Sequence, residues 1–184
     1  MDLAFSRRAR SGPAKDVILL ADQDRSRWDR LLIRRGLAAL GRGNGMARKR
    51  GVPPGRYALQ AAIAAVHAMA ATPEDTDWRR ITGLYAVLAQ RFASPVIELN
   101  RAVAVSRVHG PAAALELVDT LVAAGTLDTY HLRHAVRGDL LAQLGRHAEA
   151  SAAFTRAAEL TGNSAEQALL LDRAAACARD AGRN

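Results

Sequence analysis

The sequence of 184 residues contains little of what would build a disulfide-rich, strand-rich or membrane-spanning protein. Its one cysteine, Cys177, excludes an intramolecular disulfide and fits a reducing compartment. There are 6 prolines and 4% aromatic residues, whereas alanine is abundant, which favours helix. No run approaches the ~18 apolar residues of a transmembrane helix, and no apolar signal-peptide region follows Met1. We therefore expect a cytoplasmic, all-α protein that makes no contact with a membrane.

The net charge of +8 is concentrated in the first third of the chain. Residues 1–56 carry 14 Lys and Arg against 5 Asp and Glu, whereas residues 57–184 carry 12 against 13. A basic end of this kind can attract nucleic acid or another anionic surface. Almost all the cations are arginine, however, and an Arg- and Ala-rich composition is typical of a GC-rich genome. Nucleic-acid binding by this third is therefore kept as an alternative.

Apolar residues recur at helical spacing along most of the chain. Residues 1–21 form a partly irregular lead-in, and Asp22 or Asp24 is expected to cap a helix that ends near Leu40. Residues 41–55 are expected to form a basic, Gly-rich loop. The later helices are expected over residues 57–70, 78–92, 95–108, 112–123, 130–144, 145–163 and from 164 onward.

One stretch, Leu144–Asn163, shows how these helices pair. Gly145 ends one helix, and small residues with one aromatic then line a stripe of the next. Gly110 and Gly145 lie 35 residues apart, close to the tetratricopeptide (TPR) period of about 34. Six residues fall on the TPR signature positions: Gly138, Leu141, Gly145, Ala150, Phe154 and Ala157. The prediction is a single domain, 1–184, of antiparallel helix hairpins stacked as a TPR-like right-handed superhelix of about eight helices.

The densest polar cluster is Asp22–Asp29, with the sequence Asp-Gln-Asp-Arg-Ser-Arg-Trp-Asp. Its acids and arginines could serve as an acid–base site, but such a site needs groups held in a dry cleft at tuned pKa. A charged helix start or an internal ion-pair network explains the same residues with fewer assumptions. His131 and His134 share a helix face without a third ligand at a suitable spacing. We therefore predict no catalytic site, no metal site and no cofactor.

The blocks Leu19–Arg30, Tyr57–His67, Thr76–Trp78, Ser94–Val105 and Gly145–Asn163 together resemble one family. They closely resemble the C-terminal extension of a group of bacterial extracytoplasmic-function (ECF) sigma factors, and they keep that family's order. Members of the family are RNA polymerase sigma subunits with two DNA-reading helical regions followed by a TPR-like extension that controls or supports their activity. The resemblance places this chain partway through the extension. It implies that promoter recognition belongs to sigma regions that are absent here.

The resemblance therefore implies a non-enzymatic regulatory and protein-interaction domain that acts in the control of transcription initiation. Its partners would be sigma factor regions or RNA polymerase, with promoter DNA reached through the sigma regions alone, and the oligomeric state is left open. The alternatives are a small-molecule-sensing helical domain with a pocket near Asp22–Asp29 and Trp78, and a nucleic-acid-binding accessory domain. The candidate binding residues are Asp22, Asp24, Arg25, Arg27, Trp28, Asp29, Asp77, Trp78, Asn100 and Arg101.

Overall fold

The computed structural model describes residues 23–183 and divides the chain into two compact units, Met1–Phe92 (unit 1) and Ala93–Asn184 (unit 2). Over residues 23–183 it contains seven α-helices and no strand, which confirms the predicted all-α class. None of the helices in this range is both long and apolar enough to cross a membrane. The irregular lead-in expected at 1–21 lies outside the described residues. The single domain and the right-handed superhelix stay predictions.

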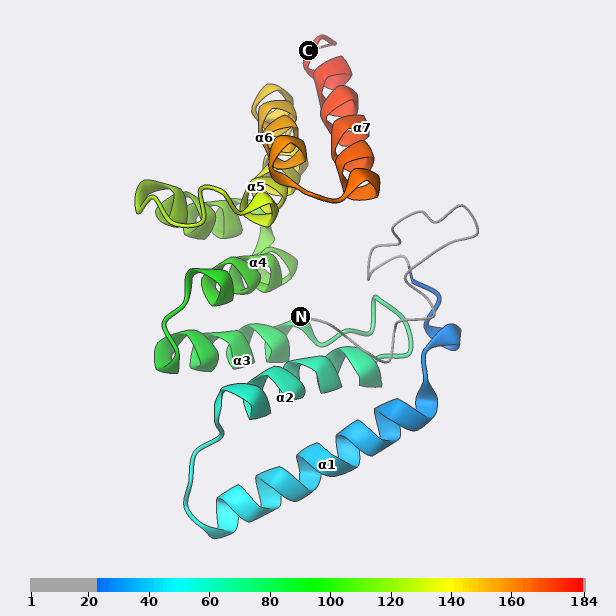
Figure 1. The fold of residues 1–184 in the computed structure, drawn as a ribbon, viewed down its shortest axis with the longest axis vertical. Coiled ribbons are helices and arrows are strands. Elements are labelled where there is room, and N and C mark those ends of the chain that lie inside the picture. The colour runs from blue at the N-terminus through cyan, green and yellow to red at the C-terminus, as the bar shows by residue number, and fades with distance from the viewer. Residues whose placement is uncertain (1–22, 184) are drawn as a thin grey trace. The chain divides into compact units, whose positions relative to one another are not determined.

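Unit 1 contains a short 3-10 helix, η2 (Arg25–Arg27), followed by α1 (Arg30–Lys49), α2 (Arg56–Met69) and α3 (Trp78–Arg91). The chain reverses direction between successive α-helices, so α1 and α2 form one hairpin and α2 and α3 form the next (Figure 1). Helix α2 contacts both of its neighbours and contributes more buried apolar residues than either of them.

The loop predicted over residues 41–55 is wrong for its first nine residues, because α1 continues as far as Lys49. The stop signal is Gly51, which has φ of 63° and ends the helix in a Schellman motif. In that motif Gly51 N donates to Arg48 O at 3.2 Å and Val52 N donates to Ala47 O at 2.9 Å. The earlier glycines of α1 are poor helix formers, but their φ is negative and they do not end the helix.

The start of α1 also differs from the prediction, because the N-cap is Asp29 instead of Asp22 or Asp24. The Asp29 carboxylate accepts a hydrogen bond from Leu32 N at 2.9 Å. Asp24 instead caps η2, so the polar cluster contains two successive caps separated by a short turn. Leu32, the residue whose N–H Asp29 caps, is 42% exposed.

Unit 2 contains α4 (Pro95–Ala123), α5 (His131–Gln143), α6 (His147–Leu160) and α7 (Ser164–Ala181). Helix α4 is two helical segments joined at Gly110, where φ is 85° and ψ is 169°. Pro111 follows directly and starts the second segment, as a proline can because its missing N–H is not needed there. The predicted break between two helices at this position is therefore present. Counted by segments, the residues described hold the eight helices expected.

The core of unit 2 includes four of the residues at TPR signature positions. Leu141, Ala150, Phe154 and Ala157 are all 0% exposed. Phe154 of α6 packs directly on Gly138 of α5, where an added Cβ would lie 2.8 Å from Phe154 Cε1. Glycine at 138 therefore lets α5 and α6 approach closely, and the phenyl ring fills the space between them. Helices α4 to α7 are stacked in chain order, and each contacts the next.

Candidate functional site

The polar motif at the start of unit 1 is organised around Arg25, one of the few buried charged residues of the described chain. Its guanidinium donates from Nη1 to His67 O at 3.1 Å and to Ala70 O at 2.9 Å. It donates from Nη2 to Thr76 Oγ1 at 3.1 Å. These acceptors lie at the C-terminus of α2 and in the loop before α3. Arg25 therefore ties η2 to two segments more than 40 residues away in sequence.

The two carbonyls are groups that α2 itself leaves unpaired. The last four carbonyls of an α-helix have no partner within the helix, and cations are favourable at its negative end. Arg25 supplies both the hydrogen bonds and the positive charge, so it acts as a C-cap delivered from a distant segment. Burial lowers the pKa of Arg25, while Glu74 and Asp75 act in the opposite direction. Its Nε is buried without a hydrogen-bond partner among the described residues.

Trp28 lies against this guanidinium, and a second tryptophan packs on His67. Trp28 is 3% exposed, its Nε1 donates to Gln23 Oε1 at 3.3 Å, and Arg25 Cζ lies 4.8 Å from its ring centroid. His67 and Trp78 pack edge to face with ring centroids 5.3 Å apart. We call Gln23, Arg25, Trp28, His67, Thr76 and Trp78 the Arg25 cluster.

Asp24, Asp29 and Asp77 are exposed, and each caps a helix. Asp24 accepts from Ser26 N at 2.9 Å, and hydrogen bonds from Ser26 lower the pKa of its carboxyl group. Asp29 and Asp77 cap α1 and α3, the latter by accepting from Arg80 N at 2.9 Å. No two of these carboxylates share a buried cleft with a titratable base. The arrangement therefore supports a charged helix start better than acid–base chemistry.

Three other candidate residues, Arg27, Asn100 and Arg101, are described within their own units. Arg27 is exposed and lines a shallow open hollow with Trp28 and Asp29. Asn100 and Arg101 belong to α4 in unit 2 and contact residues of that helix. Asn100 Nδ2 donates to Val96 O at 2.9 Å, and Arg101 pairs with Glu98 at 2.7 Å. Asp22 lies outside the described residues. The structure thus brings together Arg25, Trp28 and Trp78 of the candidates predicted from sequence.

Residues His67 and Thr76 were missed as members of the cluster. Both lie inside blocks that carry the family resemblance, but neither position has a spacing that pairs it with Arg25. A second arginine cluster was missed entirely. Arg133 of α5 is buried, forms an ion pair with Asp128 at 2.6 Å and donates to Thr126 O at 3.3 Å, so it fixes the loop that precedes its own helix.

Every hydrogen bond described for Arg25 goes to an acceptor of the protein itself. Within residues 23–183 no group of three His, Cys, Asp or Glu side chains is placed to hold a metal ion. The hydrogen bonds of Arg25 and the packing of His67 on Trp78 join η2, α2 and α3.

Burial and the nearby charge of Arg25 lower the pKa of His67 from 6.5 to about 4. Between these values the unfolded chain binds a proton at His67 that the folded chain does not, so stability falls as the pH falls. We expect the free energy of unfolding of unit 1 to decline from pH 6.5 toward 4 by at most about 1.4 kcal/mol per pH unit from this residue. Urea unfolding at several pH values, followed by tryptophan fluorescence, measures the slope, since Trp28 and Trp78 both lie in unit 1.

His67→Gln provides the matched control, because glutamine does not titrate. The pH slope of this variant should be shallower than that of the wild type, whatever the absolute cost of the substitution. Equal slopes in the two proteins would assign the decline to other groups.

The chain is similar to proteins of unknown function. Residues 1–44, which include the Asp22–Asp29 motif and most of α1, match a family of unknown function, DUF6596. An uncharacterized protein of Rhizobium meliloti (strain 1021) is 47% identical over 163 residues, which cover 89% of this chain and 37% of the relative. This chain thus spans little more than a third of that relative's length. No solved structure matches the sequence significantly.

Proposed function

We propose that this chain is a regulatory, non-enzymatic protein-interaction domain of an ECF-type RNA polymerase sigma factor, acting in the control of transcription initiation. The observation that carries the proposal is the role of the motif Asp22–Asp29. Its residues cap two helices and build the Arg25 cluster, so they specify how unit 1 folds. A chain that resembles the sigma factor extension at these residues therefore resembles it at positions that specify the fold.

The fold offers surface for a protein partner and little for chemistry. In unit 2, Val122, Leu132, Leu144 and Leu171 are each more than a third exposed. Exposed apolar side chains on rigid helices are what a protein partner buries. The acids Asp24, Asp29 and Asp77 are used as helix caps. The greater length of the rhizobial relative leaves room for further regions beside a domain of this kind.

Binding of the full chain to two purified probes tests the proposal: a bacterial RNA polymerase core enzyme, and the two DNA-reading regions of an ECF sigma factor. We expect saturable binding of micromolar strength or better to one of them by calorimetry. Because the chain carries a net charge of +8, the measurement belongs at about 300 mM salt, where the Debye length is short and non-specific attraction is weak.

Leu171→Ser, an exposed change on α7, is the variant to compare, with Ala175→Ser on the same helix as its control. No binding of either probe at about 50 μM, which corresponds to less than roughly 6 kcal/mol of affinity, would overturn the proposal.

A further inference from the structure

Helix α1 carries an unbalanced positive charge. Asp29 and Glu74 are successive acidic residues in the sequence, so the whole of α1 lacks a carboxylate. Its cations are Arg30, Arg34, Arg35, Arg42, Arg48 and Lys49, and each is exposed. No ion pair recorded between described residues involves α1. Pairs such as Arg30 and Arg34, four residues apart, repel each other on the helix surface.

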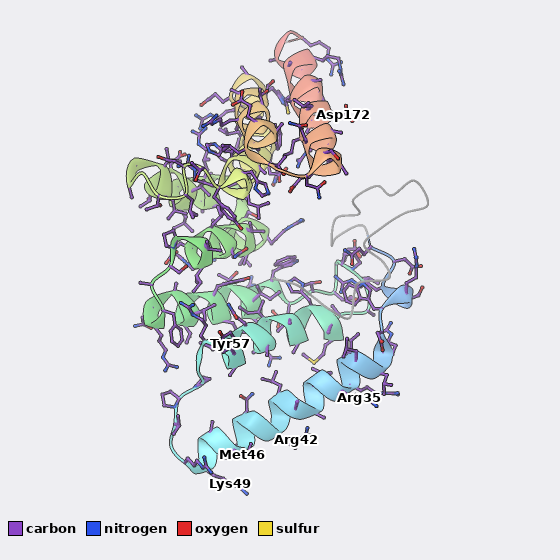
Figure 2. The ribbon with its side chains drawn as sticks, viewed as in Figure 1. Arg35, Arg42, Met46, Lys49, Tyr57 and Asp172 are labelled. Atoms are coloured by element: carbon purple, nitrogen blue, oxygen red, sulfur yellow. The ribbon has the colours of Figure 1, made fainter. Side chains whose placement is uncertain are left out.

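These cations share one face of the helix. At about 100° per residue, all six lie within a sector of roughly 140°, along a helix about 30 Å long. Arg35, Arg42 and Lys49 are spaced seven residues apart, and they project from the side of α1 that faces away from α2 (Figure 2). The opposite side carries Ile33 and Leu37, which pack in the cluster with Trp28 and Ala68. The basic face is thus turned to solvent by the packing of unit 1 itself.

The internal structure of unit 1 explains neither the charges nor the glycines of this helix. Ile33 is the one buried residue of α1. An added Cβ at Gly36, Gly41, Gly43 or Gly45 would meet no atom within 4 Å, and none of these glycines has positive φ. Glycine is a poor helix former, and it occurs where a backbone is approached closely by a ligand. Gly41 and Gly45 fall inside the basic sector, where they leave the helix surface low between the arginines.

We propose that the basic face of α1 binds the phosphate backbone of duplex nucleic acid without reading its sequence. Arginine forms paired hydrogen bonds with phosphate oxygens, and five of the six cations are arginine. The face carries no aromatic side chain on which an unpaired base could stack, which favours a duplex over a single strand. Duplex binding by α1 would add a second kind of contact to the proposed function, which concerns protein partners.

Two other anionic partners fit the face less well. The centre of a protein interface is depleted of charge and enriched in large apolar anchors. Within the basic sector Leu31 is the one such side chain, with Met46 at its edge. A membrane-surface helix inserts its apolar side into lipid, but in α1 that side packs against α2, with Leu37 and Leu40 lining an apolar cavity of about 140 Å³ between the two helices.

The test is anisotropy of a fluorescein-labelled, 25-base-pair duplex DNA of arbitrary sequence, titrated with the full chain at several salt concentrations. Counterion release predicts that log K falls with log[salt] at a slope of about −3 or steeper. The triple substitution Arg35→Gln, Arg42→Gln and Lys49→Gln should weaken binding at about 50 mM salt at least tenfold and make the slope shallower by about 2 to 3. These side chains are exposed, so the urea midpoint should stay at the wild-type value.

The matched control removes the same net charge elsewhere, by Arg146→Gln, Arg156→Gln and Arg179→Gln on exposed positions of unit 2. Arg146 and Arg156 are paired with Glu149 and Glu159, so their charge is locally balanced. This variant should bind the duplex within about twofold of the wild type.

Three outcomes would overturn the proposal. The first is the absence of saturable binding to the duplex up to about 50 μM at low salt. The second is equal weakening by the two triple variants, which would make net charge the cause. The third is binding of polyglutamate or of phosphatidylserine vesicles as tight as that of the duplex and equally lost with the α1 charges. None of these outcomes bears on binding to RNA polymerase or to sigma regions, which is measured at high salt.

Discussion

Arg25→Met is expected to lower the free energy of unfolding of unit 1 by about 3–5 kcal/mol, since it removes the donor from three buried acceptors at once. The methionine keeps most of the apolar stem against Trp28, but the carbonyls of His67 and Ala70 lose their hydrogen bonds. Buried carbonyls without a partner retain their full desolvation cost. Urea unfolding followed by tryptophan fluorescence measures the loss, with far-UV circular dichroism as a second probe because Arg25 lies over one of the rings.

Arg27→Met is the control for this prediction. Arg27 belongs to the same 3-10 helix and is exposed, so its replacement should change stability by no more than about 0.5 kcal/mol. Arg25→Lys should fall between the two, because one ammonium cannot reproduce the planar fork that reaches both α2 and Thr76. If Arg25→Met and Arg27→Met cost the same, the cluster does not hold unit 1 together.

Phe154→Ala is expected to destabilise unit 2 by about 3–5 kcal/mol, as is typical when a fully buried phenyl ring is removed. The ring is 0% exposed, rests on Gly138 and lies 4.3 Å from Arg173 Cζ. Its removal leaves a cavity between α5 and α6 that neither helix can close, because each is held by further contacts. Far-UV circular dichroism during urea unfolding measures the change, since unit 2 has no tryptophan.

A pairwise test separates packing from mere loss of apolar surface. Gly138→Ala should destabilise the wild type, because its methyl group would lie within 3 Å of the ring. In the Phe154→Ala background the same methyl group enters the cavity and should stabilise the protein. Thr155→Ala, on the exposed side of α6, serves as the control and should change stability by about 0.5 kcal/mol or less. An effect of Gly138→Ala with the same sign in both backgrounds would contradict the packing described.

Local chemistry accounts for most of the fold that could be predicted. Gly145 and the small residues after it predicted a turn and a buried stripe, and both are present, because a positive φ and close helix packing impose strict demands on residue type. Gly41–Gly55 misled the prediction for a related reason. Several glycines lower helix propensity, but a single one, Gly51, provides the left-handed residue that ends the helix. The sequence alone does not show which glycine between Gly41 and Gly55 adopts the left-handed conformation.

The candidate site was less predictable, because its contacts are non-local. Arg25 bonds to backbone carbonyls, and a carbonyl is available at every residue whatever its side chain. Nothing in the spacing between Arg25 and Ala70 indicates that they meet. The resemblance drew attention to Asp22–Asp29, but the expected binding motif includes residues whose observed contacts are caps and packing. His67 and Thr76 belong with them only once the hairpin of α2 and α3 has formed.

The glycine that joins the two segments of α4 has an evolutionary consequence. At three turns, formed by Gly51, Gly125 and Gly145, φ lies between 63° and 73°, a conformation that asparagine also adopts. Evolution can therefore replace glycine with asparagine at those turns. Gly110 combines φ of 85° with ψ of 169°, a region open essentially to glycine alone. Lineages that carry this domain can therefore exchange the residues at their other turns. At Gly110, any replacement would change the backbone conformation that forms the bend in α4.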